Sequence, residues 1–330
     1  MSATPGSLAG LEMGPPTRVA FGEALRVLGA ENRAIVVVDA DVSNSTRTDM
    51  FGAAFPDRFF QVGIAESNMV SVASGLAASG HPAVASSFAA FLTANSYDQI
   101  RMSVGFPHAD VKLVGSHSGI SIGEDGPSQM GIEDIALMTS VPGMTVVVPA
   151  DAPSCSVLTR RLFDFHGPAY LRTGRPKVPV VYTRGADELV IGRAHVLRDG
   201  SDVTLIACGL MVAASLEAAH LLAEDGIRAR VLDMHTVKPL DADAVEDAAR
   251  ETGAIVTAEE HLLDGGLASA VTRAVAQRSP CPVRFVGLDN TYARSGPPQE
   301  LLEAYGLTAE HIARAAREAI AAKGHLRRPE

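Results

Sequence analysis

Hydrophobic residues along the chain form short runs that alternate with longer amphipathic segments. Up to residue 176, five runs rich in β-branched residues predict strands: AIVVVDA, FFQVG, PAVASSF, VKLVG and MTVVVPA. Apolar residues at helical spacing occupy the intervals between them. This rhythm predicts an α/β fold in which a mostly parallel sheet is covered by helices on both faces.

The same rhythm restarts after a stretch rich in Pro, Gly and charge, residues 177–191, which we interpret as a linker. The runs DVTLIACG, RARVLDM, AIVTAEE and PVRFVGL predict a second, smaller α/β domain. The predicted organisation is therefore a flexible tail, a first domain, the linker and a second domain, at residues 1–16, 17–176, 177–191 and 192–330. The segment TAEHIARAAREAIAAK predicts a closing amphipathic helix with Thr308 as its N-cap.

Composition narrows the class of protein. A chain of 330 residues with 47% hydrophobic content is long enough for a large core and about two domains. A net charge of −10 and the lack of a basic run argue against nucleic acid as a partner. The N-terminal segment lacks the features of a signal peptide and no apolar stretch reaches bilayer length, so we expect a cytoplasmic protein without a membrane partner. The cysteines lack metal-ligand spacing and are expected to be reduced core residues: Cys155, Cys208 and Cys281.

Polar loops follow several of the predicted strands. In parallel sheets ligands bind beyond the carboxyl ends of the strands, so chemistry is expected in DADVSNSTRTD, GIAES and SHSGISIGEDGPSQMG. The first loop alternates oxygen-bearing side chains like a calcium loop. However, Asn44 and Met50 occupy the positions that need glycine and a bidentate acid, so calcium binding is not predicted. A solvated turn remains an equally good interpretation of this loop.

The third loop, residues 116–131, is longer than the roughly 2 to 6 residues usual between elements of α/β units, and long loops are often functional. It contains one His and no Cys, which disfavours a metal site. Its polar residues favour a small-molecule site: His117, Glu124, Asp125, Ser128 and Gln129.

One acidic residue, Glu66, lies where the strand-like run FFQVG changes into a helix of small apolar residues. A lone carboxylate buried there would cost several kcal/mol unless it had a partner, which could be protein or ligand. Phe88 and Phe91 lie at the end of another predicted strand. Two aromatic residues at this spacing are usually core, although they could also form a wall for a flat ring.

Four motifs carry a family resemblance: VGIAESNM, SSFAAFLTANSYDQIRM, SHSGISIGEDGPSQMGIEDIALMTSVPGMTVVVPAD and YLRTGRP. In this order, from about residue 17 to about residue 307, the chain resembles the pyrimidine-binding and C-terminal domains of thiamine-diphosphate-dependent transketolases. The resemblance implies that Glu66 is catalytic: it pairs with a ring nitrogen of the aminopyrimidine of the cofactor and is protonated or shares a proton there. That contact favours the imino tautomer, which removes the thiazolium proton to give the nucleophilic ylid.

The resemblance also assigns roles to other residues. It places Phe88 and Phe91 around the aminopyrimidine, His117 beside the hydroxyketone end of the donor, and Asp125 at a substrate hydroxyl. It implies that the sugar phosphate is held by Arg18, Ser45 and Arg175, with Asp41 on the same polar wall and Arg172 as a further member. Arginine suits this role because its planar fork can bind phosphate oxygens in two places.

The chain departs from the family pattern in two respects. Gln129 occupies a position where yeast and many bacterial transketolases carry histidine and animal-type enzymes carry glutamine, which affects proton transfer near the acceptor and the substrate range. In addition, the chain contains no GDG followed some thirty residues later by Asn, the motif that holds Mg²⁺ and the cofactor diphosphate in this family. The chain therefore resembles the C-terminal subunit of a split transketolase.

The resemblance implies an enzyme subunit that uses thiamine diphosphate and Mg²⁺ to transfer a two-carbon ketol unit from a ketose phosphate to an aldose phosphate. The metal ligands would lie on an N-terminal subunit with the GDG…N motif, in an α2β2 heterotetramer. Alternatives are a 1-deoxyxylulose-5-phosphate synthase-like enzyme, the β subunit of a 2-oxoacid dehydrogenase, and a non-catalytic partner protein. The motifs RTGRP and GEDGPSQ favour transketolase, and the intact Glu66, His117 and Asp125 argue against a non-catalytic protein.

Overall fold

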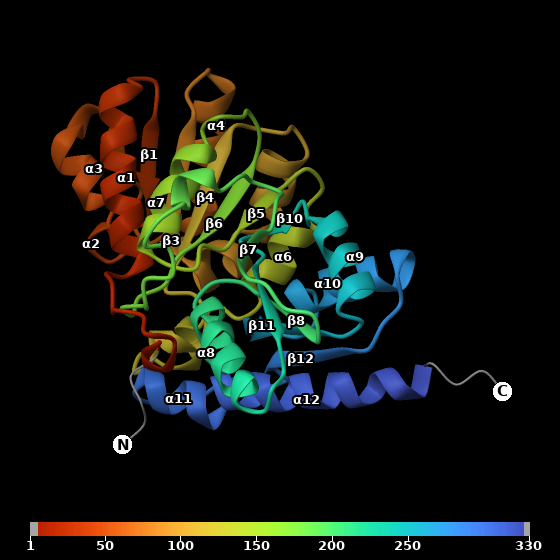
Figure 1. The fold of residues 1–330 in the computed structure, drawn as a ribbon. Helices are drawn as coiled ribbons and strands as arrows, with labels where there is room; N and C mark the ends of the chain where they lie inside the picture. The colour runs from red at the N-terminus through yellow and green to blue at the C-terminus, as the bar shows by residue number, and fades with distance from the viewer. Residues whose placement is uncertain (1–5, 327–330) are drawn as a thin grey trace.

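The computed structural model describes residues 6–326, which form two sheets, each covered by helices on both faces (Figure 1). The first sheet has the order β10-β5-β6-β4-β3-β1-β2. Its strands are β1 Val36–Asp39, β2 Phe59–Gln61, β3 Ala83–Phe88, β4 Val111–Ser116, β5 Thr145–Val147, β6 Ala169–Arg172 and β10 Thr236–Lys238. All pairs within it are parallel except β10 with β5.

The second sheet has the order β12-β11-β8-β9-β7. Its strands are β7 His195–Arg198, β8 Val203–Ala207, β9 Ala229–Asp233, β11 Ile255–Leu262 and β12 Val283–Leu288. Only the edge strand β7 runs antiparallel. Two mostly parallel sheets covered by helices confirm the predicted fold class, and each of the predicted apolar runs contains a strand.

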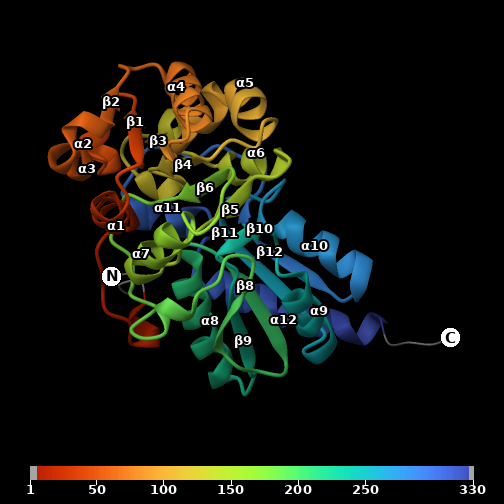
Figure 2. The same cartoon turned by 90° about the horizontal axis from the view of Figure 1, so that it is seen from above.

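Two layers of helices cover each sheet, as the view from above shows (Figure 2). In the first half one layer contains α1 Thr17–Glu31, α3 Asp49–Ala54 and α7 Ala152–Arg161, and the other contains α4 Glu66–Ala78, α5 Tyr97–Gln99 and α6 Asp134–Ser140. The second sheet lies between α8 Met211–Glu224 with α12 Ala309–Leu326, and α9 Ala242–Glu251 with α10 Leu267–Arg278. Two further short helices are α2 Ser43–Thr46 and α11 Pro298–Ala304. The closing helix begins directly after Thr308, where the sequence places it.

The two halves of the chain share a sheet. Strand β10, from the second half, pairs with β5 and thereby extends the first sheet across the junction. The segment is only three residues long and follows the stronger run RARVLDM, so the sequence pattern did not reveal it. The division of the chain at residues 177–191 stays a prediction.

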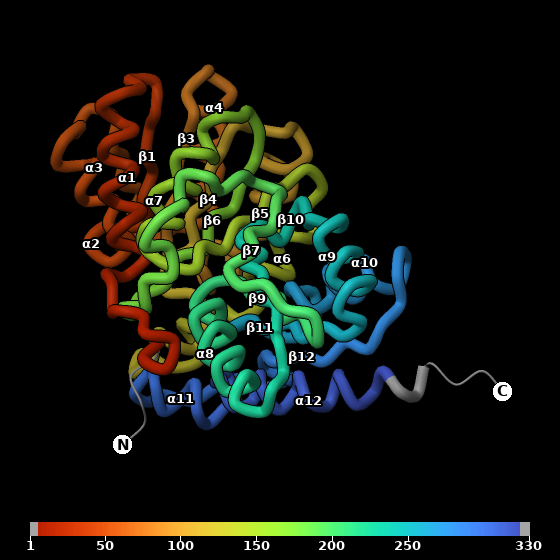
Figure 3. Tube along the Cα trace, in the orientation of Figure 1, coloured from red at the N-terminus to blue at the C-terminus, as the bar shows by residue number. Residues whose placement is uncertain are grey.

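The N-terminal segment crosses to the second half (Figure 3). The backbone N–H of Gly14 donates to the carbonyl of Val178 at 2.8 Å, and the N–H of Leu8 donates to the carboxylate of Glu217 on α8 at 3.1 Å. Residues 1–5 of the expected tail lie outside the described residues.

The register of the first sheet aligns the ends of its central strands. Asp39 of β1 pairs with Ser86 of β3, and Phe88 of β3 pairs with Ser116 of β4. Because these strands are parallel, the loops that follow them leave the sheet at one edge. The polar loops singled out in the sequence therefore converge at one edge.

Cys155 and Cys208 are buried and unpaired, as predicted, whereas Cys281 is only half-buried. Among the described helices, none is both long enough and apolar enough to cross a lipid bilayer. Location in the cytoplasm stays a prediction.

Candidate functional site

The carboxyl of Glu66 has a protein partner, but that partner is a neutral hydroxyl. Glu66 is the first residue of α4 and is 5% exposed. Its Oε1 accepts a hydrogen bond of 3.0 Å from Oγ of Ser87, near the end of β3. Within residues 6–326, no Lys, Arg or His forms an ion pair with Glu66. A buried carboxyl with one neutral donor keeps hydrogen-bonding capacity for a ligand.

An aromatic stack begins at the residue after Ser87. Phe88 ends β3, and Phe91 begins a π-helical turn, Phe91–Asn95. Their rings are nearly parallel, at 8°, with centroids 5.8 Å apart, and the His117 ring stacks on Phe88 at 3.9 Å. A third ring between the two phenylalanines would need roughly 7 Å, twice the contact distance of carbon atoms. A flat ligand must therefore lie against an outer face or edge of this stack.

His117 is a neutral hydrogen-bonding group in a strained position. Its φ of 58° lies in the left-handed region, which is uncommon for residues other than glycine. Burial, and then the charges of Arg18, Arg175 and Arg47, lower the pKa of the ring to about 3. Nε2 lies 3.3 Å from Nη1 of Arg18, and Nδ1 lies 2.9 Å from Oγ of Ser116. Since a guanidinium only donates, Nε2 is the acceptor and Nδ1 carries the proton.

Arg18 and Arg175, both predicted to hold phosphate, lie far from this histidine in the sequence, yet each lowers the pKa of His117. Nη1 of Arg18 donates to the backbone carbonyl of Ser45 at 2.7 Å. Nη1 of Arg175 donates to the carbonyl of Ile122 at 2.8 Å. The structure thus brings together three of the predicted residues, Arg18, Ser45 and His117, through direct contacts.

A buried acid that the sequence interpretation did not assign holds the loop with Asp41 and Ser45. Asp39 ends β1 and accepts hydrogen bonds from the hydroxyls of Thr46 and Thr48 at 3.0 and 2.8 Å, and from the N–H of Val42 at 2.8 Å. Burial raises the pKa of the Asp39 carboxyl, although these hydrogen bonds oppose the shift. Asp39 thereby closes a short turn in which Asp41 has a φ of 66°. The segment DADVSNSTRTD, for which calcium binding was not predicted, is thus a turn closed by hydrogen bonds to Asp39.

The remaining predicted residues lie on the long loop. Asp125 is exposed and its Oδ2 lies 3.4 Å from Nη1 of Arg175, while Glu124 lies 3.8 Å from the same nitrogen. Gln129 is half-buried at the end of a 3₁₀ turn, Pro127–Gln129. The acids of the loop therefore neutralise Arg175, so it differs from Arg18, which forms no ion pair with an acid among the described residues.

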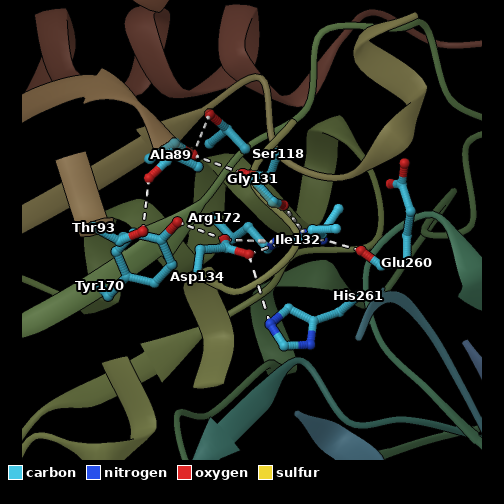
Figure 4. Close-up of polar contacts among 12 residues, drawn as sticks. Ala89, Thr93, Ser118, Gly131, Ile132, Asp134, Tyr170, Arg172, Glu260 and His261 are labelled. Atoms are coloured by element: carbon cyan, nitrogen blue, oxygen red, sulfur yellow. Dashed lines mark hydrogen bonds and ion pairs between the residues drawn. The ribbon is translucent and has the colours of Figure 1, made fainter. Parts of the chain in front are cut away.

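Arg172 does not belong to this group. It is 6% exposed and forms an ion pair with Asp134, with Nε 2.8 Å from Oδ2. Its Nη2 also donates to the carbonyls of Gly131 and Glu260, at 3.0 and 2.9 Å (Figure 4). Burial alone would lower the pKa of its guanidinium, but the charge of Asp134 raises that pKa above its ordinary value. The prediction that Arg172 is a further phosphate ligand is not supported, because Arg172 is buried and its Nε and Nη2 donate to these protein acceptors.

Residues of the second domain contact the long loop, residues 116–131. Oε1 of Glu260, on β11, accepts the N–H of Ser121 at 2.6 Å. A side chain at Gly119 would meet the Glu260 carboxylate at 2.2 Å, so only glycine fits there. Nε2 of His261 accepts from the N–H of Ala136 at 3.3 Å. The same nitrogen faces Asp134, with 3.9 Å between Nε2 and Oδ1 (Figure 4). The loop that holds His117 therefore rests on groups more than a hundred residues away.

The larger of two described cavities lies away from Glu66. It measures about 690 Å³ and lies between the linker, α8, α11 and the start of α12. Of the loop 116–131 only Ser121 reaches it. In the described part of the chain, no group of three or more His, Cys, Asp or Glu residues is arranged to hold a metal ion.

The geometry combines a buried acid, a stacked aromatic wall, a neutral histidine and a cationic rim at the carboxyl edge of one sheet. Such a site can bind a flat ring through the acid and the aromatic wall, and an anionic ligand through the arginines. The sequence interpretation missed Ser87, Asp39 and Glu260. Each acts through a hydrogen bond to a residue outside its own strand, so no local pattern marks it.

Comparison with known proteins gives a consistent result. The family described as transketolase, pyrimidine binding domain, matches residues 13–180, and the transketolase C-terminal domain matches residues 192–312. The chain is 42% identical to transketolase-like protein 2 of Mus musculus, covering 92% of the chain but 48% of that protein. It therefore spans about half the length of this relative.

Other relatives have nearly the same length as this chain. The putative transketolase C-terminal section of Methanocaldococcus jannaschii is 38% identical, covering 90% of this chain and 94% of that protein. A subunit of the apulose-4-phosphate transketolase of Phocaeicola vulgatus is 37% identical, covering 91% of this chain and 96% of that protein. A solved structure described as a split gene transketolase, inactive beta4 tetramer, is 44% identical, with a TM-score of 0.85 over 94% of this chain and 99% of that chain.

Proposed function

Because the chain belongs to the transketolase family, we propose that it is the C-terminal subunit of a two-chain transketolase that moves a ketol unit from a ketose phosphate to an aldose phosphate. The observation that carries this proposal is the convergence of Glu66, Phe88 and His117 at one sheet edge, in a chain that covers 96% of a relative that is itself a transketolase subunit but 48% of a longer one.

The residues at this edge fit the aminopyrimidine half of thiamine diphosphate. When bound, the cofactor would supply a nucleophilic carbon and an electron sink for the ketol unit. Glu66 would hold a ring nitrogen of the pyrimidine, because it is buried and its protein partner, Ser87, is a single neutral donor. An open face or edge of the stack formed by Phe88, Phe91 and His117 would orient the ring and exclude water from it.

Neutral His117 gives the site a group that accepts or donates hydrogen bonds without adding charge. Its pKa of about 3 keeps it neutral at neutral pH. It would position the hydroxyl groups of the donor, together with Asp125 and Gln129, while Arg18, Ser45 and Arg175 hold the terminal phosphate. Asp41, in its left-handed backbone conformation, would line the same wall.

The other half of the cofactor requires a second chain. The sequence lacks the GDG…N motif, so the ligands of Mg²⁺ and the diphosphate would lie on an N-terminal subunit, in an α2β2 heterotetramer. Ile64, two residues before Glu66, is 84% exposed. A large exposed apolar residue beside a site is typical of a surface that a partner covers. One solved relative, described as an inactive beta4 tetramer, is consistent with self-association of such a chain without its partner.

Reconstitution tests this proposal. The full chain alone, its predicted N-terminal partner alone, and the mixture are each assayed for ketol transfer with thiamine diphosphate and Mg²⁺. Cofactor binding is measured by calorimetry. We expect activity and tight cofactor binding only in the mixture, because each chain holds one end of the ligand and the two weak contacts reinforce each other.

Mass measurement of the mixture should show two copies of each chain. Full activity from this chain alone would show that the two-chain architecture is wrong. A mixture that binds the cofactor but transfers no ketol unit to any aldose phosphate would favour a non-catalytic partner or another thiamine diphosphate reaction.

A further inference from the structure

A third arginine, Arg47, lies beside the two that the family resemblance assigned to the sugar phosphate. Like Arg18, it is half-buried and forms no ion pair with an acid among residues 6–326. The Nε atoms of Arg18 and Arg47 are both buried and have no hydrogen-bond partner. Two adjacent guanidinium groups with unsatisfied buried donors are costly for the free chain, because each donor has lost water without replacing it.

The backbone holds Arg47 firmly in this place. The hydroxyls of the residues on either side, Thr46 and Thr48, both donate to Asp39. Arg47 itself has a φ of 70°, in the left-handed region that favours glycine. A strained conformation fixed on both sides by buried hydrogen bonds is typical of functional positions.

Close packing against the first helix explains why Arg47 lies near Arg18. A Cβ added at Gly22 of α1 would lie 2.7 Å from Cβ of Arg47 and 2.5 Å from its carbonyl oxygen. Gly22 is one helical turn after Arg18, on the same face of α1. The glycine therefore lets Arg47 lie against α1 beside Arg18.

The charges of these residues act on each other. Burial, followed by the charges of Arg47 and Arg175, lowers the pKa of Arg18. The acids Asp125 and Glu124 face Arg175, but neither forms an ion pair with Arg18 or Arg47. Glu124 and Asp125 therefore offset the charge of Arg175, whereas Arg18 and Arg47 have no acidic partner among the described residues. Two guanidinium groups without a counter-ion attract an anion of charge −2 more strongly than one of charge −1.

We propose that Arg47 is a specificity residue that joins Arg18 and Arg175 in a three-arginine pocket for a dianionic group, the terminal phosphate monoester of the sugar. The proposal rests on the proposed function for the identity of the sugar, but not for the binding of the dianion. Phosphate monoesters are dianionic above a pKa of about 6 and offer three acceptor oxygens, which suits three guanidinium groups.

The first test measures binding of inorganic phosphate to the full chain, without partner or cofactor. Thermal unfolding is followed with phosphate and with chloride at equal ionic strength, at a pH at least one unit above about 6. We expect phosphate to raise the Tm of the wild type more than chloride does, because a ligand that binds the native state stabilises it. Arg47→Gln should lose most of this shift, while Arg26→Gln, an exposed arginine on α1, should keep it.

The second test measures kcat/KM in the reconstituted complex with fructose 6-phosphate and with fructose as donors. Arg47→Gln should lower kcat/KM for the phosphate ester about tenfold to a hundredfold, as expected for one charge-assisted contact, and should change that for fructose far less. Arg47→Lys should recover part of the loss because it keeps the charge without the fork.

The two tests separate the two proposals. An equal loss for both donors, or a phosphate-dependent Tm shift that survives in Arg47→Gln, overturns the role of Arg47. If the reconstituted complex transfers no ketol unit but the Tm shift depends on Arg47, the proposed function fails and the dianion pocket stands.

Discussion

Two sites in this chain contain buried or half-buried arginines, and they differ in whether an acid neutralises the charge. At the domain junction, Arg172 is 6% exposed and paired with an acid: Asp134 accepts from its Nε and Nη2, and two backbone carbonyls also accept from Nη2. At the sheet edge, Arg18 and Arg47 have no acidic partner within the described residues and keep buried nitrogens without acceptors. A buried charge with a counter-ion is costly to separate from it, whereas a charge that the fold leaves without a counter-ion is available to a ligand.

Position in the sequence does not show which arginine has an acidic partner. Arg172 and Arg175 are three residues apart in YLRTGRP, and the family resemblance suggested that both bind phosphate. Arg172 ends β6 and points into the junction (Figure 4). Arg175, past the strand, reaches the carbonyl of Ile122 and the acid of Asp125. An arginine in a ligand motif must therefore be judged by the groups that it contacts.

The largest expected effect is a loss of turnover at the sheet edge that holds Glu66. Glu66→Gln should lower turnover of the reconstituted complex about a hundredfold to ten-thousandfold, the usual range for proton-transfer roles. The side-chain amide of this variant cannot transfer or share a proton as the carboxyl of Glu66 can. Turnover is measured at saturating cofactor, and calorimetry of unfolding checks that the fold is kept. Ser87→Ala is the control, since it removes only the hydroxyl that holds Glu66 and should cost less. Near-normal turnover of Glu66→Gln would refute the catalytic role of this residue.

At the junction, the expected effect is on stability. Asp134→Ala should lower the free energy of unfolding by about 3 to 5 kcal/mol, because it leaves the charge of Arg172 buried without a counter-ion. Urea denaturation measures this loss. The double variant Asp134→Asn with Arg172→Met removes both charges and should lose less than the sum of the two single changes. A cost below about 1 kcal/mol for Asp134→Ala would mean that the pair behaves as an exposed one.

A pH dependence should mark the contact between the second domain and the long loop. Burial, opposed by the charge of Arg172, raises the pKa of Glu260 to about 7, so the folded chain binds its proton more tightly than the unfolded chain. This carboxyl therefore adds stability at low pH that is lost as the pH rises towards 7. Between about pH 5 and pH 8 the loss should reach at most about 3 kcal/mol.

Thermal unfolding across this range checks the expected pH dependence. Glu260→Gln, which mimics the protonated acid, should make the curve less steep and be relatively more stable at the upper end. Burial also raises the pKa values of Glu259 and Asp233 to about 7, so part of the slope should remain. Glu300→Gln on α11 changes an exposed acid and should leave the curve unchanged. Identical curves for the wild type and Glu260→Gln would show that Glu260 does not titrate in this range.

The smallest expected effect is on the stability of the free chain and concerns the arginines without an acidic partner. Arg47→Gln should raise the free energy of unfolding of the free chain, by at most about 0.5 kcal/mol, because it relieves repulsion from Arg18. The gain should be larger at an ionic strength of about 0.01 M than at about 1 M, where salt screens the repulsion. A loss of stability in chemical denaturation would place Arg47 in the same class as Arg172.

Nine of the twelve described strands and the α/β class could be predicted from the sequence, and family motifs named the candidate site residues. Strands such as VVVD are short apolar runs whose signal is local, and the edge at which Glu66, Phe88 and His117 meet follows from the rule for parallel sheets. Local patterns could also place the closing helix, because its apolar spacing and its first residue lie in one stretch.

Only the tertiary structure decided which charges are satisfied. Arg172 meets Asp134 across 38 residues, Glu260 reaches Ser121 across 139, and β10 joins a sheet made otherwise from the first half. Arg47 lies beside Arg18 because Gly22, on a different helix, leaves room for it. Such pairings depend on how distant segments pack, and their energies depend on burial, so a periodic pattern contains no record of them.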